Sequence, residues 1–250
     1  MKTSNASRRV GRPPDAALVC RRTEEIVAAA TLLFAKLGFA ETDTQTLADQ
    51  LGMGKGTIYR YFQCKEDLFL AAVDRAIRQL VEEVDAAVAV ETDPLGRVAC
   101  SVHAYLRFFD RNPHVVELLI QERARFKDRR KPTYFQYRDA NIGRWHELFR
   151  ELIRAKRIRP IDVERISNVM GNLLYGTMFT NYFVGRTHSL ESQADEILDI
   201  VFHGILVKEM TRKNELKNIK PQLIESRPKT RRGADNQNRR LAKNRRGVSI

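Results

Sequence analysis

Residues 44–68 constrain this 250-residue chain more than any other part of it. They read TQTLADQLGMGKGTIYRYFQCKEDL, which predicts a short helix, a turn at Gly52 and a second short helix over residues 55–61. Glycine fits the end of the first helix because it adopts the left-handed conformation at little cost. The second helix is too short to be stable alone, so Ile58 and Phe62 must anchor it. This pattern is typical of a helix-turn-helix unit.

Polar side chains mark both short helices. Thr42, with Gln45 three residues later, predicts a capping box at the start of the first. The second has an outer face of basic, hydroxylated and aromatic side chains, and such groups can contact base edges and phosphates in a major groove. The alternative is an ordinary helical hairpin on a protein surface. The predicted outward residues are Lys55, Thr57, Tyr59, Arg60 and Tyr61.

Residues 26–70 closely resemble the N-terminal domain of TetR/AcrR-type transcriptional regulators. The resemblance rests on Gly52, KGTIY at 55–59, YF at 61–62 and KEDLF at 65–69. It implies an all-α fold, with an N-terminal three-helix helix-turn-helix DNA-binding domain and a C-terminal helical bundle for effector binding and dimerisation. The residues at positions that tend to face DNA in that family are Thr44, Lys55, Gly56, Thr57, Tyr59, Tyr61 and Lys65.

Two positions depart from the family pattern. Gly54 stands where the family often has serine, so a hydroxyl that would cap the second short helix and contact a phosphate is absent. Cys64 stands at another frequent serine or threonine position, and cysteine is a poor helix cap. A thiol sensor at Cys64 is a minor alternative, because a helix start beside Lys65 can lower a thiol pKa.

Positive charge is concentrated at the two ends of the chain. Residues 1–22 carry +5 and residues 211–250 carry +10, so the residues between them carry −2 of the total of +13. Basic ends on a near-neutral body fit a nucleic-acid binder, because they displace counterions from phosphates. No apolar run approaches the ~20 residues of a membrane-spanning helix. The N-terminus lacks the apolar segment of a secretory signal, so we expect a cytoplasmic protein without a membrane partner.

Both ends are predicted to lie outside the folded body. Arg8, Arg9 and Arg12 belong to the sequence RRVGRPP, and an extended arm of this composition can lie in a narrow minor groove. Residues 1–22 are therefore interpreted as a basic, flexible arm, with a solvated terminus as the alternative. Residues 211–250 contain few large apolar groups, so we expect a basic disordered tail that adds DNA affinity or serves only as a solubilising extension.

The sequence between the ends predicts helices throughout and no strand. The first helix is expected over 23–37, ended by Gly38, within a DNA-binding domain over 23–70. The fourth is expected from 65 to about 90, so it enters a sensing and dimerisation domain over 71–210 without a flexible linker and can transmit displacement. The later helices are expected over residues 94–110, 113–127, 132–156, 162–183 and 190–210.

The last two predicted helices have broad apolar faces. In the resembling family such helices usually pair with their copies in a four-helix homodimer interface, and Gly171, Gly176 and Gly204 would permit close approach. Ordinary core packing within one chain is the alternative. The apolar positions are Ile166, Val169, Met170, Leu173, Leu174, Met178, Ile197, Val201 and Ile205.

Aromatic residues are concentrated in the helices between residues 94 and 183. In the resembling family the corresponding bundle often encloses an effector pocket, and an aromatic lining suits an apolar or aromatic small molecule. Core packing is the alternative for any single residue. The predicted pocket residues are Tyr105, Phe109, Trp145, Phe149, Tyr175 and Phe179.

Patterns for catalysis and metal binding are missing from the sequence. The histidines show no HExxH spacing, the three cysteines are widely separated, and no Gly-rich phosphate loop follows a strand. We therefore expect no enzyme, cofactor or metal site. The sequence predicts a sequence-specific, ligand-responsive regulator, more simply a repressor, that binds a palindromic double-stranded operator as a homodimer. A nonspecific, nucleoid-type DNA-binding protein is the main alternative, and a helical enzyme is a second.

Overall fold

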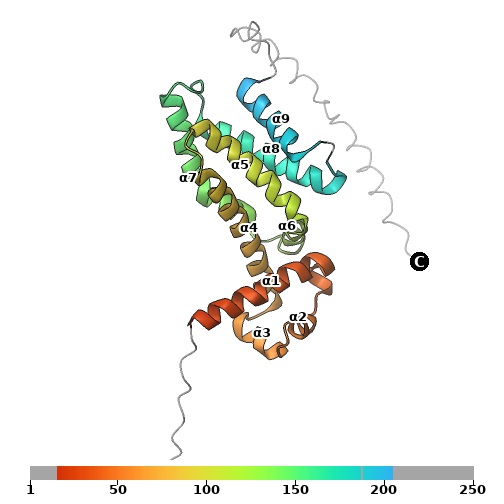
Figure 1. Cartoon of the computed structure of the whole chain (residues 1–250). Coiled ribbons are helices and arrows are strands. Elements are labelled where there is room, and N and C mark those ends of the chain that lie inside the picture. The colour runs from red at the N-terminus through yellow and green to blue at the C-terminus, as the bar shows by residue number, and fades with distance from the viewer. Residues whose placement is uncertain (1–15, 187, 205–250) are drawn as a thin grey trace, which may run out of the picture. The chain divides into compact units, whose positions relative to one another are not determined.

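The computed structural model describes residues 16–186 and 188–204, and helices are the only regular elements within these ranges (Figure 1). The all-α fold class is therefore confirmed. Arg8, Arg9, Arg12 and the tail over 211–250 lie outside the described residues. No helix in the described part of the chain is both long and apolar enough to cross a membrane. The helices are α1 (Ala16–Glu41), α2 (Thr44–Gln50), α3 (Lys55–Tyr61), α4 (Lys65–Ala89), α5 (Pro94–Arg111), α6 (Pro113–Arg125), α7 (Thr133–Arg154), α8 (Val163–Val184) and α9 (Leu190–His203).

Helix α1 begins at Ala16, so the predicted start at Thr23 is wrong. The Thr23 hydroxyl donates to the carbonyl oxygen of Val19 one turn earlier, which places Thr23 inside the helix. Residues 16–22 are therefore helical, although the basic arm was predicted to extend to residue 22. Gly38 interrupts the helical dihedrals with φ 85° and ψ 160°, in agreement with the predicted end of the first helix.

Helix α2 is capped by Asp43, so the predicted capping box at Thr42 is wrong. The Asp43 carboxylate accepts a hydrogen bond from the Gln45 backbone N–H at 2.8 Å. The Thr42 hydroxyl is occupied elsewhere, because it donates to the carbonyl oxygen of Gly38 at 2.7 Å. At the other end of α2, Gly52 has the predicted left-handed conformation, with φ 62°.

An aromatic cluster joins α1 and the start of α4 to the end of α6. Phe34 of α1 and Phe69 of α4 meet edge to face with ring centroids 5.1 Å apart, and Phe39 lies 5.3 Å from Phe69. Phe126, just after α6, lies 5.7 Å from Phe69 and 5.8 Å from Phe39. Each such pair contributes about 0.5–1.5 kcal/mol beyond its burial. The end of α6 is thus packed against the aromatic side chains of α1 and α4.

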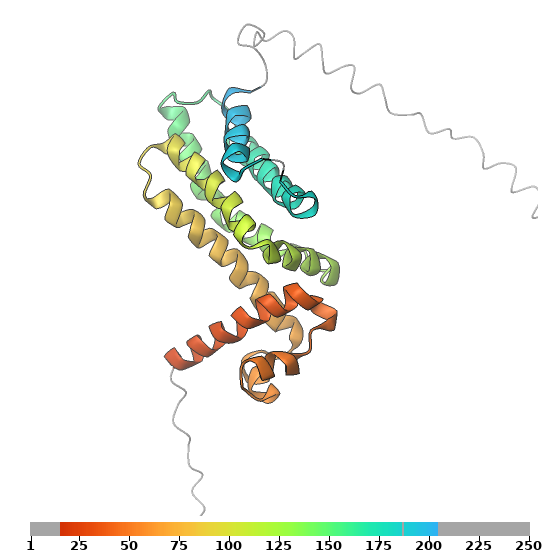
Figure 2. The ribbon, with the colours of Figure 1, turned by 45° about the vertical axis from the view of Figure 1, so that its right-hand side comes forward.

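Helix α4 runs without a break from α3 into the remaining helices, as predicted. Figures 1 and 2 show it running from α1, α2 and α3 into the remaining helices. It packs against α1, α5, α6 and α7, while α8 packs on α5, α6 and α7 and α9 packs on α5. A movement of α4 relative to the bundle would therefore also displace α1.

Candidate DNA-binding surface and ligand cavity

Helix α3 presents one face to the core and the other to solvent. Ile58 is fully buried and Phe62 is buried just after the helix ends. On the outer side Gly56 and Arg60 are exposed, and Tyr59 keeps 40% of its surface accessible. Thr57 and Tyr61 are half-buried. The predicted two-faced character of this helix is therefore present in the structure.

Lys55 is held at the start of α3 by a residue that the sequence did not single out. Its Nζ donates to the Asp43 carboxylate at 3.0 Å. The pKa of Asp43 is lowered, first by the backbone N–H of Gln45 and then by Lys55, and Asp43 in turn raises the pKa of Lys55. One carboxylate thus caps α2 and positions the first cation of α3.

Thr44 was predicted to face DNA, but its side chain is buried, with 3% of the residue exposed. Its hydroxyl lies 3.1 Å from the hydroxyl of Tyr59 across the turn. In this conformation Thr44 orients Tyr59, and a direct contact between Thr44 and DNA stays a prediction.

Lys65 is half-buried at the start of α4. Its Nζ donates to the carbonyl oxygen of Ala40 at 3.0 Å and lies 4.8 Å from the ring centroid of Phe39. The preceding residue, Cys64, gives α4 no side-chain cap, as expected for cysteine. A hydrogen bond from the Asp67 backbone lowers the Cys64 pKa, but desolvation and the carboxylates of Asp67 and Glu66 outweigh it, so the thiol pKa is raised above 9.0. A reactive thiolate at Cys64 is therefore not favoured.

A groove beside the exposed face of α3 includes residues from α1. Thr57, Arg60 and Tyr61 line it together with Leu18 and Arg22. The sequence did not assign Leu18 and Arg22 to this surface, because the first helix was expected to start at Thr23. The early start of α1 therefore adds a basic side chain beside α3.

A cavity of about 160 Å³ lies among α4, α5, α7 and α8. Three predicted pocket residues, Tyr105, Trp145 and Phe149, line it. The wall is otherwise mainly apolar, with Ile77, Leu80, Val81, Val84, Val98, Ile142, Met170 and Leu174, and it includes the polar residues Ser101, Tyr134, Tyr137, Arg138, Asn141, Arg144 and Ser167.

The other three predicted pocket residues do not line this cavity. Phe109 packs on Tyr105 with ring centroids 5.0 Å apart but is not part of the lining. Tyr175 packs on Tyr134 at 4.9 Å and on Phe179 at 4.9 Å. All three take part in the aromatic packing around the cavity, and Phe109 and Tyr175 each also line a separate hollow.

Two tyrosines form a buried polar pair on the cavity wall. The hydroxyls of Tyr105 and Tyr134 lie 3.0 Å apart. Burial raises the pKa of Tyr134 to about 12 and that of Tyr105 well above its ordinary value. Both phenols are therefore neutral at physiological pH, and the Tyr105 hydroxyl can also donate to Met178 Sδ at 3.8 Å.

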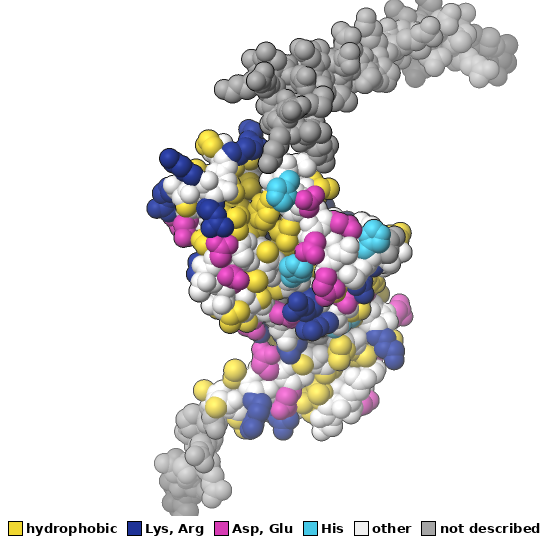
Figure 3. All heavy atoms as spheres, turned by 45° about the horizontal axis from the view of Figure 1, so that its top comes forward, with side chains coloured by type: hydrophobic (Ala, Val, Ile, Leu, Met, Phe, Trp, Pro, Cys, Tyr) yellow, Lys and Arg dark blue, Asp and Glu magenta, His cyan; other side chains and the backbone are white. Residues whose placement is uncertain are grey.

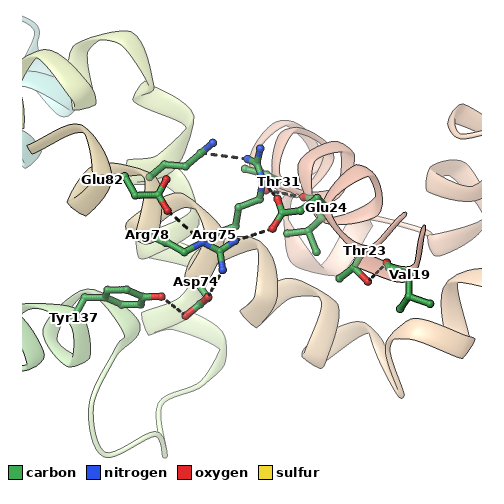
Figure 4. Close-up of polar contacts among 11 residues, drawn as sticks. Val19, Thr23, Glu24, Thr31, Asp74, Arg75, Arg78, Glu82 and Tyr137 are labelled. Carbon is green, nitrogen blue, oxygen red and sulfur yellow. Dashed lines mark hydrogen bonds and ion pairs between the residues drawn. The ribbon is translucent and has the colours of Figure 1, made fainter. Parts of the chain in front are cut away.

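A third tyrosine on the wall is linked to the DNA-binding helices through charged side chains (Figure 4). Tyr137 donates to the Asp74 carboxylate at 2.8 Å, and Asp74 lies 3.8 Å from Arg78. Arg78 and Arg75 both donate to Glu24 of α1, at 2.8 and 3.0 Å. Desolvation and the bond to Asp74 raise the Tyr137 pKa to about 12. The series runs from the cavity across α4 to α1.

In the described ranges no group of three or more histidine, cysteine, aspartate or glutamate side chains could hold a metal ion. The structure combines a helix-turn-helix unit that has a polar outer face with a mainly apolar cavity. Helix α4 packs against α1 and also lines this cavity. These features define the class of DNA-binding regulators with a helical second domain.

The comparisons with known proteins name the family within this class. Residues 26–72 match the model of the bacterial regulatory proteins of the tetR family. The chain is 27% identical over 144 residues to the nucleoid occlusion factor SlmA of Vibrio campbellii, covering 56% of this chain and 69% of SlmA. Residues 26–72 therefore form a DNA-binding domain of the TetR-family type, as the resemblance in this segment predicted.

Solved structures with the same fold are also found. The regulator FadR from Bacillus subtilis, in complex with stearoyl-CoA, has a TM-score of 0.60 at 17% identity, covering 73% of this chain and 98% of that one. The TetR family regulator PfmR from Thermus thermophilus has a TM-score of 0.58 at 22% identity, covering 73% and 99%. At these identities the likeness shows the fold alone.

Proposed function

We propose that this chain is a ligand-responsive repressor that binds a roughly palindromic operator as a homodimer in the cytoplasm. The observation that carries the proposal is the double role of α4. Ile77, Leu80 and Val84 of α4 form part of the cavity wall. Arg75 and Arg78 of the same helix hold Glu24 of α1. A ligand that favours another position of α4 would therefore also shift the DNA-binding helices.

The operator would be contacted chiefly through α3 and the groove beside it. Thr57 would meet a base edge, while Arg60 and Tyr61 would contact phosphates. Gly56 is exposed, and apart from its chain neighbours and its own helix backbone no heavy atom lies within 4 Å of where its Cβ would be, so a DNA backbone could approach closely there. Lys55, Tyr59 and Lys65 complete the proposed DNA surface, with Thr44 acting through Tyr59.

Dimerisation is supported by apolar side chains that the single chain leaves exposed. Figure 3 shows one face of the molecule, on which apolar side chains form patches between charged ones. On α8 the exposed fractions are 50% for Val169, 39% for Leu173 and 64% for Phe183, and on α9 Ile200 is 54% exposed. Exposed apolar surface of this kind marks an interaction site. Pairing about a two-fold axis would place two α3 helices on successive major grooves of a palindrome, about 34 Å apart.

The dimer can be tested with a matched pair of variants. Leu173→Arg places a charge on the proposed interface, and Val90→Arg places the same charge at the end of α4, where Val90 is 83% exposed. Sedimentation velocity should show a dimer for the wild type and Val90→Arg and a monomer for Leu173→Arg. The Leu173→Arg protein should also lose high-affinity operator binding. A Leu173→Arg protein that remains dimeric would remove α8 from the interface.

The basic ends of the sequence support a second candidate, in which the chain coats DNA with little sequence preference. Selection of bound duplexes from a random pool separates the two. The proposed repressor should enrich one palindromic sequence and bind it at least about 10³-fold more tightly than random duplex at physiological salt. Affinities within a few-fold of each other for all duplexes would favour the second candidate.

A further inference from the structure

The ligand cavity contains a cation whose charge no neighbouring side chain balances. Arg138 of α7 donates from Nη2 to the Asn168 side chain at 2.9 Å, and its guanidinium carbon lies 5.6 Å from the Phe135 ring centroid. Within the described residues no carboxylate oxygen lies within 4.0 Å of its nitrogens, and Arg138 Nε is buried without a hydrogen-bond partner. Buried donors are almost always paired, so this one is available to a ligand.

A second buried group on the same wall also lacks a partner. Ser167 of α8 keeps only 7% of its surface exposed, and its hydroxyl has no hydrogen bond to any described residue. Three buried side-chain atoms in the described part of the chain are unpaired, and two of them, Arg138 Nε and Ser167 Oγ, belong to residues that line this one cavity. The third belongs to Gln121, which lies outside the lining.

Neighbouring contacts hold the Arg138 guanidinium against α8. A Cβ built on Gly171 would lie 3.9 Å from Arg138 Nη1, so the guanidinium reaches the part of α8 that is open at this glycine. Asn168, one residue after Ser167, accepts the hydrogen bond from Nη2. The cation and the serine hydroxyl therefore belong to the same stretch of the cavity wall, between α7 and α8.

The other cation on the wall is already neutralised. Arg144 forms an ion pair with Asp85 of α4. The tyrosine pair Tyr105 and Tyr134 is neutral and internally bonded. The lining thus has one uncompensated positive charge, which suits a ligand with a single negative charge better than a doubly charged phosphate ester.

We infer that the effector is a small monocarboxylate with an apolar body, whose carboxylate binds at Arg138 and Ser167 and whose body lies against the apolar wall. This inference rests on the proposed function, because it takes the cavity to be the effector site. A cavity of about 150 Å³ can hold benzene, so the 160 Å³ here suits one ring or a short alkyl chain. The apolar body would contact side chains of α4, including Ile77, Leu80 and Val84.

The chain carries its own reporter for this site. Trp145 is the only tryptophan in the sequence, and it lines the cavity. Octanoate and 4-ethylbenzoate should therefore change its emission on binding. Each acid is compared with its neutral amide, which has nearly the same shape. Charge-assisted hydrogen bonds predict at least a tenfold tighter binding of each acid than of its amide, measured by fluorescence and by calorimetry.

Substitutions on the cavity wall test which residues cause the preference for the acid over its amide. Arg138→Met should bring the acid-to-amide ratio of affinities close to one, and Ser167→Ala should weaken acid binding by about three- to tenfold while the melting temperature stays near that of the wild type. Arg144→Met is the matched control, since it removes a cation from the same wall whose charge Asp85 already balances, and it should keep the preference. Arg138→Gln replaces Arg138→Met if the latter does not fold.

The inference is overturned if neither acid binds more tightly than its amide, or if a folded Arg138 variant keeps the preference. Operator binding is measured in parallel with the same ligands. Acid binding that depends on Arg138 but leaves operator affinity unchanged would support the carboxylate site and contradict its regulatory role. Operator release by the neutral amides at the same concentrations as the acids would support regulation and contradict the carboxylate site.

Discussion

Gln121 of α6 donates a hydrogen bond from Nε2 to the carbonyl oxygen of Phe34 in α1 at 3.1 Å, and thereby ties the bundle to the DNA-binding helices. The same amide donates to Glu117 at 2.9 Å. Glu117 in turn accepts a hydrogen bond from the Tyr182 hydroxyl of α8, also at 2.9 Å. A polar path therefore leads from α8, the proposed dimer helix, through α6 to α1.

Gln121→Ala should loosen this connection at a modest cost in stability, about 1 kcal/mol for one hydrogen bond. We expect a folded dimer with weaker operator binding or a smaller response to effector, because α1 is no longer tied to α6. Gln136→Ala is the control. Gln136 also donates to a backbone carbonyl, that of Lys131, but this hydrogen bond does not connect the bundle to α1. Urea denaturation and operator titrations distinguish the two effects. Equal operator affinities and equal effector responses of the two variants would show that the hydrogen bond between Gln121 and Phe34 does not couple the bundle to α1.

Gly56→Ala should separate stability from DNA binding. Gly56 lies in α3 with open space where a Cβ would stand, so alanine should leave the free energy of unfolding unchanged or raise it by up to about 1 kcal/mol. A methyl group there would nevertheless obstruct a DNA backbone, and we expect at least a tenfold loss of operator affinity. Gly143→Ala in α7 has the same open surroundings and should leave DNA binding intact. Undiminished binding by Gly56→Ala would place the DNA elsewhere.

Thr57→Ala tests readout of the base sequence. If the methyl and hydroxyl of Thr57 meet a base edge, the variant should weaken operator binding by about 1 kcal/mol and relax the preference at one base position. Arg60→Ala should instead weaken operator and random duplex alike, as expected for a phosphate contact. Lys65 is less suited to this comparison, because it also bonds to Ala40 inside the domain. Equal losses on both duplexes for Thr57→Ala would contradict the base contact.

Local sequence signals predicted the helices well where they depend on neighbours along the chain. The span of α3 and the left-handed Gly52 follow from apolar spacing and glycine chemistry. The cap of α2 was predicted wrongly, because the side chains of Thr42 and Asp43 can both cap a helix. Contacts with other residues decide between them. The start of α1 was missed for a similar reason, since Thr23 has a hydroxyl suited to either a cap or a helix interior.

The candidate cavity was only partly predictable, because aromatic content does not show which faces of four helices converge. Tyr105, Trp145 and Phe149 line the cavity, whereas Tyr175 packs on Tyr134. The polar end was overlooked entirely. A signal was present, since Arg138 lies four residues after Tyr134 and seven before Trp145, on the same helical face. A charged residue on such an apolar face indicates a buried partner or a ligand.

Asp93 predicts a dependence of stability on pH. Its carboxylate accepts hydrogen bonds from Arg157 at 2.9 Å and from the Gly96 backbone at 3.0 Å, and in that order these lower its pKa below 3.8. Because the pKa of Asp93 is lower in the folded state, its ionised carboxylate stabilises the fold above pH 3.8. This stabilisation is lost as the pH falls through the pKa of the folded state. The stability difference between the wild type and Asp93→Asn should thus be constant near neutral pH and shrink below about pH 3.8. Urea denaturation at several pH values measures it, and parallel curves would contradict the assignment.

Tyr137→Phe tests the link between the cavity and α1. The change removes the hydroxyl that donates to Asp74 and leaves the ring on the cavity wall, so ligand affinity and folding should change little. Asp74, Arg78 and Glu24 would remain paired with one another but lose their connection to α7. We expect operator affinity near that of the wild type without effector and a severalfold smaller loss of affinity when effector is added.

Tyr175→Phe supplies the matched control for this variant. Tyr175 also lies in the aromatic bundle, but its hydroxyl makes no hydrogen bond to any residue that the structure describes, and it does not line the cavity. Its removal should leave the response to effector intact. Because effector binding and operator binding share one coupling free energy, that energy should fall equally whether it is measured from the ligand or from the DNA. A Tyr137→Phe protein with an unchanged coupling energy would show that the shift of α4 is transmitted by apolar packing alone.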